Sequence, residues 1–174
     1  PTLGILSDIY GKKPEAVFFS CYIWNIEKVK ELTDNIRKIM PETEIWLGGP
    51  EVSFAPCRVL KENSSVDGII CGEGEETFFQ VVSALESCRA ASRTSLLQRF
   101  SHINGIIFRN EYGDVIENSQ RKPVELNDIP FLYEDVENFR NRIIYYESSR
   151  GCPFRCSYCL SSIEKSLRFR NIDI

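Results

Sequence analysis

Short apolar runs rich in β-forming residues alternate with segments of helical period along the first half of the sequence. Residues 16–22, 44–47 and 67–71 are such runs, each too short for an ordinary helix. After each run lies a segment whose apolar residues recur every three or four positions. Strands separated by helix-length segments imply βαβ units. The alternation therefore predicts an α/β domain with a parallel, doubly wound sheet.

Three segments carry the helices that we expect between the strands. The clearest is 26–39, which Asn25 can cap at its N-terminus and Pro41 ends. Two further helices are expected at about 54–62 and 76–87. These segments supply the layers that cover the predicted sheet.

The flanking regions are less regular. Residues 1–10 place their apolar side chains near one helical face without a capping residue or preceding strand, so we expect the chain to begin within a fold. Residues 87–101 are polar and weakly patterned. Residues 104–110 and 114–117 flank Gly113 and predict a hairpin at a sheet edge.

A second domain is expected to begin near residue 143. Residues 121–142 contain Pro123 and Pro130 and no sustained periodicity, which indicates an interdomain linker. The apolar run that follows, 143–147, predicts another strand. We thus expect domains at 1–120 and 143–174.

Composition limits the partners and the compartment. The 174 residues are 43% hydrophobic and 26% charged, as in globular proteins, and the net charge of -4 argues against direct nucleic-acid binding. No apolar run approaches the roughly 20 residues that span a bilayer, and no secretory signal begins the sequence. We expect a cytoplasmic protein without membrane contacts.

The seven cysteines fall into two groups. Cys21, Cys57, Cys71 and Cys88 are scattered, a distribution unlike a disulfide framework, and Cys21 and Cys71 lie in apolar runs as small buried hydrophobes would. The other three crowd into eight residues near the end of the sequence.

Those three cysteines, Cys152, Cys156 and Cys159, have the spacing Cys-x-x-x-Cys-x-x-Cys directly after the predicted strand. Thiolates on one short loop can face a common centre, and their softness favours zinc or iron-sulfur chemistry. Structural zinc wants four protein ligands, and no second pair or nearby histidine follows. A [4Fe-4S] cluster with one open iron suits three ligands better, and zinc remains the alternative.

This spacing, with Arg150-Gly151-Cys152-Pro153 before it and an aromatic before the last cysteine, resembles the radical S-adenosylmethionine superfamily. The resemblance implies that Cys152, Cys156 and Cys159 bind a [4Fe-4S] cluster whose fourth iron chelates S-adenosylmethionine, which is cleaved reductively to a 5'-deoxyadenosyl radical. It also implies that Tyr158 lines the adenine side of that site.

The residues after the predicted strands are the second group of candidates, because open α/β sheets bind ligands beyond the carboxyl ends of their strands. Glycines there let a flat ligand approach the backbone, although each one also suits an ordinary tight turn. We expect a bulky side chain at Gly49 to enter the ligand's space. The acids at 73–76 are explained by the helix dipole, with cofactor contact through the Gly72 and Gly74 backbone as the alternative. The candidates are Ser20, Cys21, Tyr22, Trp24, Asn25, Gly48, Gly49, Pro50, Glu51, Gly72, Glu73, Gly74 and Glu75.

Together with the cysteine loop, these three loops resemble cobalamin (B12)-binding radical S-adenosylmethionine enzymes. The resemblance implies a flavodoxin-like, cobalamin-binding domain that lacks its first strand and the Asp-x-His-x-x-Gly loop, followed by the truncated start of a radical S-adenosylmethionine barrel. The only histidine, His102, lies outside the ligand-facing loops, and we expect it to be a surface or packing residue.

The resulting hypothesis is a cobalamin-dependent radical enzyme of unknown substrate, with methyl transfer as one possible reaction. A reductant such as flavodoxin or ferredoxin is implied by the family, and this fragment alone is expected to be inactive and to hold no catalytic residue. The first alternative is a radical enzyme whose N-terminal domain has lost cobalamin and serves as a substrate-binding or docking module. The second is a small cluster-bearing electron carrier, which would need a fourth ligand from this chain.

Overall fold

The computed structural model describes residues 2–87, 96–133, 135–154, 156–159 and 167–171. Contacts divide the chain into two compact units, Pro1–Lys122 and Pro123–Ile174. The finer division into 1–120, 121–142 and 143–174 stays a prediction, and residues 160–166 and 172–174 of its last part lie outside the described residues.

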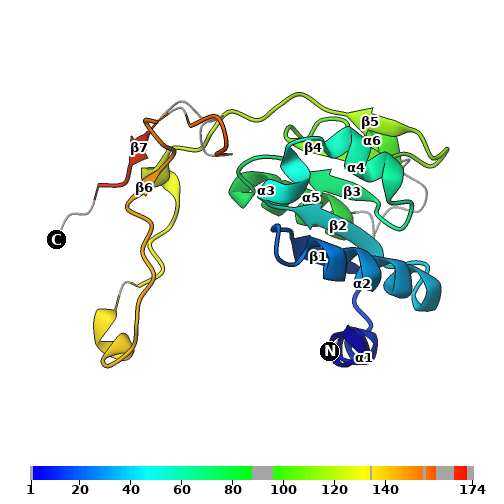
Figure 1. The fold of residues 1–174 in the computed structure, drawn as a ribbon, viewed down its shortest axis with the longest axis horizontal. Helices are drawn as coiled ribbons and strands as arrows, with labels where there is room; N and C mark the ends of the chain where they lie inside the picture. The colour runs from blue at the N-terminus through cyan, green and yellow to red at the C-terminus, as the bar shows by residue number, and fades with distance from the viewer. Residues whose placement is uncertain (1, 88–95, 134, 155, 160–166, 172–174) are drawn as a thin grey trace. The chain divides into compact units, whose positions relative to one another are not determined.

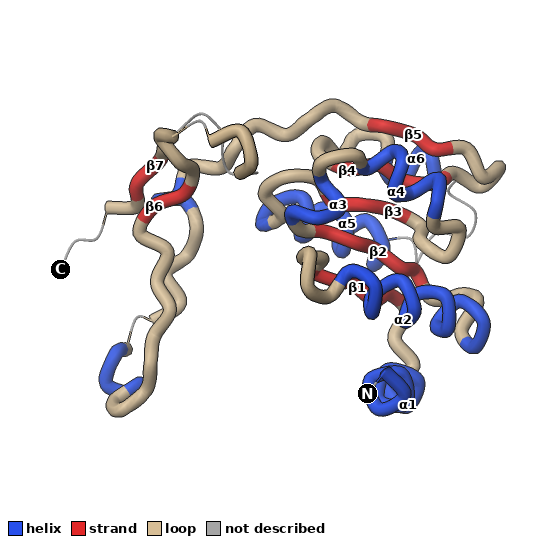
Figure 2. The backbone as a smooth tube through the Cα atoms, viewed as in Figure 1, coloured by secondary structure: helices blue, strands red, loops and turns tan. Residues whose placement is uncertain are grey.

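The first unit is built on a five-stranded mixed sheet in the order β1-β2-β3-β4-β5 (Figures 1 and 2). The first three strands, β1 (Ala16–Ser20), β2 (Glu44–Gly48) and β3 (Gly68–Ile70), are parallel. The hairpin of β4 (Ile106–Arg109) and β5 (Val115–Glu117) joins them antiparallel and forms the edge. The expected α/β class and the edge hairpin are confirmed.

Helices cover both faces of this sheet because successive strand residues point to opposite sides. On β2, Ile45 and Leu47 join one core cluster, while Trp46 joins the other. The first cluster includes residues of α2 (Ile26–Ile39), α3 (Pro50–Ser53) and α4 (Pro56–Glu62), and the second includes residues of α5 (Glu75–Ser87) and α6 (Leu96–Phe100). Each helix among the described residues is too short or too polar to serve as a membrane span.

Several helix predictions need correction or addition. The helix expected at 54–62 is α4, which begins at Pro56, and the short α3 helix before it, which begins at Pro50, was not expected. Within the weakly patterned stretch, α6 was not foreseen, and residues 88–95 of that stretch lie outside the described residues. The expected amphipathic start is α1 (Thr2–Lys12), which packs on α2, and His102 is exposed as expected.

A partly buried polar network joins the starts of β2 and β3 to the last turn of α2. The guanidinium of Arg37 pairs with Asp67 and donates to the carbonyls of Ser65 and Thr43. Asp67 also accepts a 2.7 Å hydrogen bond from the backbone N–H of Ile45. Burial raises the pKa of Asp67, while the Ile45 and Arg37 hydrogen bonds oppose the shift. This network stabilises the edge of the sheet opposite the strand C-termini.

The second unit has little regular structure among its described residues. Its two-stranded sheet pairs β6 (Ser149–Arg150) with β7 (Arg168–Phe169), and two 3-10 turns, η1 (Leu126–Asp128) and η2 (Val136–Phe139), precede it. The strand expected at 143–147 is wrong, since those residues pair with no strand. Arg170 lies over the rings of Phe131 and Tyr146, which gives this unit a small aromatic cluster.

Candidate functional site

The three parallel strands end side by side at one edge of the sheet. Ser20 of β1 lies opposite Gly48 of β2, and Gly48 lies opposite Ile70 of β3. The residues that follow these positions therefore emerge next to one another from the C-terminal edge, where open α/β sheets bind ligands. The structure thus gathers the three loops that the sequence analysis singled out.

The loop after β1 is held by the side chain of Asn25. Its Oδ1 accepts a 2.7 Å hydrogen bond from the backbone N–H of Tyr22, and its Nδ2 donates to the carbonyl of Ser20 at 2.9 Å. Asn25 stands at the N-cap position of α2, yet its side chain makes no capping hydrogen bond. The expected capping role is wrong, because the amide fixes the loop instead.

Two aromatic rings on this loop form an exposed flat surface. Tyr22 and Trp24 stack with centroids 4.6 Å apart and planes 8° apart, and 77% of Trp24 remains accessible. Ile23 between them is equally exposed. Exposed apolar side chains grouped beside strand ends are typical of binding surfaces.

The loop after β2 is packed against the loop after β1. Cys21 donates its backbone N–H to the carbonyl of Gly48 at 2.7 Å, and its own carbonyl accepts from the N–H of Glu51 at 3.2 Å. Gly49 has a φ of 98°, and a Cβ placed there would lie 2.7 Å from the Cys21 carbonyl oxygen. Only glycine fits this turn. The expectation that a side chain at Gly49 would enter ligand space is wrong, since that space is filled by the Cys21 backbone.

Ser53 links the second loop to the third and is not among the residues predicted for the site from sequence. Its hydroxyl donates to the carbonyl of Gly49 at 2.8 Å and accepts from the backbone N–H of Gly72 at 3.4 Å. The first contact is a serine back-bond within the short α3 helix, and the second depends on the tertiary fold. A serine four residues after a glycine gives no sequence signal for that second contact.

The loop after β3 leaves open space around its glycines. Gly72 has a φ of 74°, and a Cβ built on it would meet nothing within 4 Å. A Cβ on Gly74 would meet only the Cγ2 of Ile70, at 3.9 Å. Of the glycines in the three loops, these two border space that a ligand can enter.

The acidic residues after this loop include one with a structural partner. Glu76 forms an ion pair with Arg121 at 2.8 Å, and the Arg121 side chain is only 12% exposed. This contact gives Glu76 a role in packing that neither the helix-dipole explanation nor cofactor contact anticipates.

Two thiols lie at the strand ends, Cys21 buried and Cys71 partly buried. Cys21 is fully buried, which confirms the expectation, and Cys71 packs partly buried against the same core cluster. Burial raises the pKa of Cys21 to about 11 and that of Cys71 to about 12. At neutral pH both thiols are therefore protonated in the folded protein.

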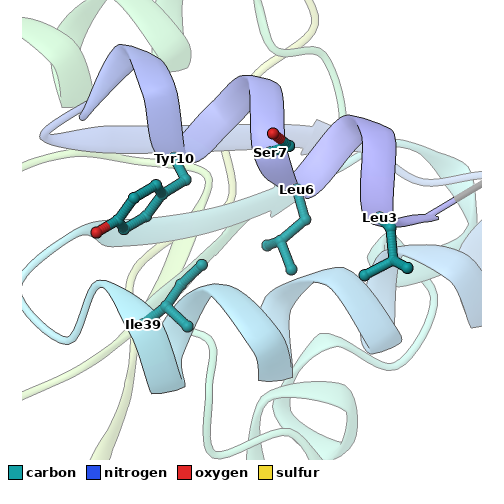
Figure 3. A pocket seen from close by; sticks show the side chains of 5 residues that line it. All are labelled: Leu3, Leu6, Ser7, Tyr10 and Ile39. Atoms are coloured by element: carbon teal, nitrogen blue, oxygen red, sulfur yellow. The ribbon is translucent and has the colours of Figure 1, made fainter.

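A separate apolar cavity of about 510 Å³ lies between α1 and α2 (Figure 3). Leu3, Leu6, Ser7 and Tyr10 line it from α1, and Ile39 lines it from α2. It has no charged side chain in its lining and belongs to the flank of the sheet rather than to the strand C-termini. It offers none of the convergent polar groups that a specific ligand site needs.

The three cysteines of the second unit follow β6. Gly151 takes a φ of 98° directly before Cys152, and the backbone N–H of Cys159 donates to the carbonyl of Cys156 at 3.1 Å. All three cysteines are partly buried, and Tyr158 is 90% exposed. Within the described residues, no three cysteine, histidine or acidic side chains converge as metal ligands, so the structure does not gather these thiols.

Residues 2–82 match the B12 binding domain family. The chain is 26% identical over 157 residues to the cobalamin-dependent radical SAM methyltransferase TokK of Streptomyces tokunonensis, covering 84% of this chain and 22% of that protein. It is 29% identical over 142 residues to an uncharacterized methyltransferase of Pyrococcus horikoshii, covering 81% and 28%. The chain thus spans about a quarter of the length of these relatives.

A solved structure shares the fold. The cobalamin-dependent S-adenosylmethionine radical enzyme OxsB, with aqua-cobalamin and S-adenosylmethionine bound, matches with a TM-score of 0.71 at 22% identity. The match covers 98% of this chain and 23% of that one.

The first unit is an α/β domain that resembles B12-binding domains, in sequence over residues 2–82 and in fold. The chain as a whole resembles the cobalamin-binding radical S-adenosylmethionine enzymes.

Proposed function

We propose that the first unit binds cobalamin along the C-terminal edge of β1, β2 and β3, as part of a radical S-adenosylmethionine enzyme. The observation that carries the proposal is the strand register, which aligns Ser20, Gly48 and Ile70 and so places three loops on one edge. The residues assigned to this edge are those of the three loops, Ser20, Cys21, Tyr22, Trp24, Asn25, Gly48, Gly49, Pro50, Glu51, Gly72, Glu73, Gly74 and Glu75.

The residues divide into a frame and a contact surface. Cys21, Gly49 and Asn25 form the frame, because their contacts are with neighbouring backbone. The open space at Gly72 and Gly74 and the exposed face of Trp24 provide the contact surface. A large flat ring with polar edges suits a site that combines backbone amides, small residues and an aromatic wall. The loops therefore fit a corrin.

For the second unit we propose that Cys152, Cys156 and Cys159 ligate a [4Fe-4S] cluster, with Tyr158 beside S-adenosylmethionine. Three thiolates are the donor set that such a cluster takes from protein, with one iron left for another ligand. Because their side chains do not converge in the structure, cluster binding must draw the loop together around the metal.

The whole protein is then an enzyme whose cofactors carry the chemistry. When bound, the cluster and S-adenosylmethionine would supply reductive cleavage to a 5'-deoxyadenosyl radical, and cobalamin would supply methyl-group chemistry. The chain's own residues bind and orient these groups. We further propose a cytoplasmic setting, a flavodoxin or ferredoxin as reductant, and no activity for the 174 residues alone.

The test is a titration of the full-length protein with cobalamin under reducing conditions, followed by absorbance. A change in the corrin absorption bands that saturates at one equivalent is expected. Protein purified from cells grown with cobalamin should also carry the cofactor. Absence of binding by folded protein would overturn the proposal.

The alternative function is a docking module that has kept the fold and lost the cofactor. The exposure of Ile23 and Trp24 favours this alternative, because exposed apolar side chains are also typical of surfaces that bind a partner protein. A folded protein that cleaves S-adenosylmethionine but shows no corrin band would support this alternative.

A further inference from the structure

Arg121 is a largely buried arginine that reaches back from the end of the first unit to the start of α5. Its Nε donates to the hydroxyl of Thr77 at 2.7 Å, and its Nη1 lies 2.8 Å from the Glu76 carboxylate. Its Nη2 donates to the side-chain carbonyl of Gln80. Three acceptors on the first turns of one helix thus use the fixed fork of the guanidinium.

The other end of the loop is tied to the same cluster. The backbone N–H of Cys71 donates to the carbonyl of Gly105 at 2.8 Å. A Cβ on Gly105 would lie 3.2 Å from both the Cβ of Arg121 and the hydroxyl of Thr77, so the turn packs directly on this pair. Residues 72–74 therefore lie between two fixed points, the start of α5 and the contact of Cys71 with Gly105. Both points contact Arg121 or its partner Thr77.

We propose that Arg121 is the positioning residue of the third loop at the proposed cobalamin edge. It fixes the start of α5 directly and, through Gly105, the residue that precedes Gly72. The open space beside Gly72 and Gly74 keeps its shape because both ends of the loop are held before a ligand arrives. Preorganisation of this kind lowers the ordering cost of binding. The inference rests on the proposed function and deepens it.

The guanidinium geometry makes a specific prediction about conservative change. A lysine would keep the positive charge near Glu76, but one ammonium cannot satisfy Thr77, Glu76 and Gln80 in a single plane. Arg121→Lys and Arg121→Ala should therefore both loosen the loop.

Arg109 provides the matched control. It is also an arginine with part-buried hydrogen bonds, and its Nη2 donates to the carbonyl of Leu60 at 2.6 Å. Its backbone N–H donates to the carbonyl of Asp67, at the end of β3 away from the loops. Arg109→Ala should lower stability without reaching residues 72–78.

Two measurements test the proposal. Amide hydrogen exchange on the 174-residue chain, at a temperature where each variant is folded, should show exchange at residues 72–78 at least about 10-fold faster in Arg121→Ala and Arg121→Lys than in wild type, and unchanged there in Arg109→Ala. Absorbance titration of the full-length protein should show cobalamin affinity about 10-fold weaker in both Arg121 variants, which corresponds to about 1.4 kcal/mol of binding free energy. The affinity of Arg109→Ala should be unchanged.

The outcomes separate the two claims. Unchanged exchange at residues 72–78 in Arg121→Ala, or equal acceleration in Arg109→Ala, would overturn the role of Arg121. Faster exchange with undiminished affinity would also overturn it, because the held loop would then not matter for binding. Wild-type protein that binds no cobalamin would instead overturn the proposed function, while the exchange result would still decide whether Arg121 holds the loop.

Discussion

Gly49 and Cys21 are packed backbone to backbone, with the missing Cβ of Gly49 directed 2.7 Å from the carbonyl oxygen of Cys21. The contact joins the loops after β1 and β2 and leaves no room for any side chain at position 49. A glycine in a candidate ligand loop is thus explained by the protein's own packing.

Gly49→Ala is therefore expected to destabilise the fold by roughly 2 kcal/mol or more, from the strained φ of 98° and the clash together. Gly11→Ala is the control, since Gly11 lies in α1 with nothing within 4 Å of its added Cβ, and alanine favours a helix. Urea unfolding of the two variants measures both free energies. A free energy of unfolding for Gly49→Ala equal to that of wild type would contradict the prediction, because the turn would then accept a Cβ without cost.

Asp67 predicts a pH dependence of stability. Its pKa is raised in the folded state by burial, so the native state holds this proton more tightly than the unfolded chain does. The stability that Asp67 contributes is therefore complete below its unfolded pKa and is lost as pH rises through the folded value, with a slope of at most about 1.4 kcal/mol per pH unit.

Asp67→Asn removes this titration and keeps an acceptor for the N–H of Ile45. The free energy of unfolding of wild type minus that of Asp67→Asn should fall as pH rises from about 4 toward neutrality. Burial also raises the pKa of the neighbouring Glu44, and the charge of Asp67 adds to that shift. The comparison should therefore be repeated in a Glu44→Gln background, where only Asp67 of this pair titrates. A difference that grows with pH would contradict the sign.

Thiol labelling tests the placement and the raised pKa of Cys21 and Cys71. With a pKa of about 11, Cys21 holds about 100-fold less thiolate at pH 8 than an ordinary cysteine of pKa 9.0, and it is fully buried besides. Iodoacetamide should therefore modify Cys21 and Cys71 only after urea is added, as read by peptide mass spectrometry. Rapid modification of either in folded protein would contradict their placement.

The cysteine loop is tested by activity and by metal content. In anaerobically reconstituted full-length protein, replacing Cys152, Cys156 or Cys159 with alanine should remove the bound iron and abolish 5'-deoxyadenosine formation. Cys57→Ala is the control, since Cys57 lies in α4 of the first unit. Undiminished 5'-deoxyadenosine formation in any loop variant would remove that cysteine from the ligand set.

Much of the first unit follows from local sequence pattern. The helix at Ile26–Ile39 carries its apolar stripe and is stopped by Pro41, and the strand runs before and after it pair as their β-forming residues predict. The Gly113 turn likewise specifies the β4–β5 hairpin. These elements are determined by residues close in sequence.

The remaining features depend on contacts between distant residues. Phe100 of α6 is buried against Trp46 and Phe108. The five residues of α6 are too few to show a helical pattern in the sequence, so this packing was not predicted. Residues 143–147 have strand composition but no pairing strand, because a strand needs its partner. The side chains of Ser53 and Arg121 acquire their roles from residues 19 and 44 positions away in the chain. Sequence patterns alone identify neither.

Cobalamin affinity with and without a side chain in the open space of the third loop tests the central claim most directly. Gly74→Leu adds a side chain whose Cβ meets only Ile70, at 3.9 Å, so the variant should fold, and thermal melting checks this. Gly11→Leu adds the same side chain to α1, away from the strand ends. In absorbance titrations of the full-length protein, cobalamin affinity should fall at least about 10-fold in Gly74→Leu and stay at the wild-type value in Gly11→Leu. Equal affinity in wild type and folded Gly74→Leu would contradict cobalamin binding at this edge.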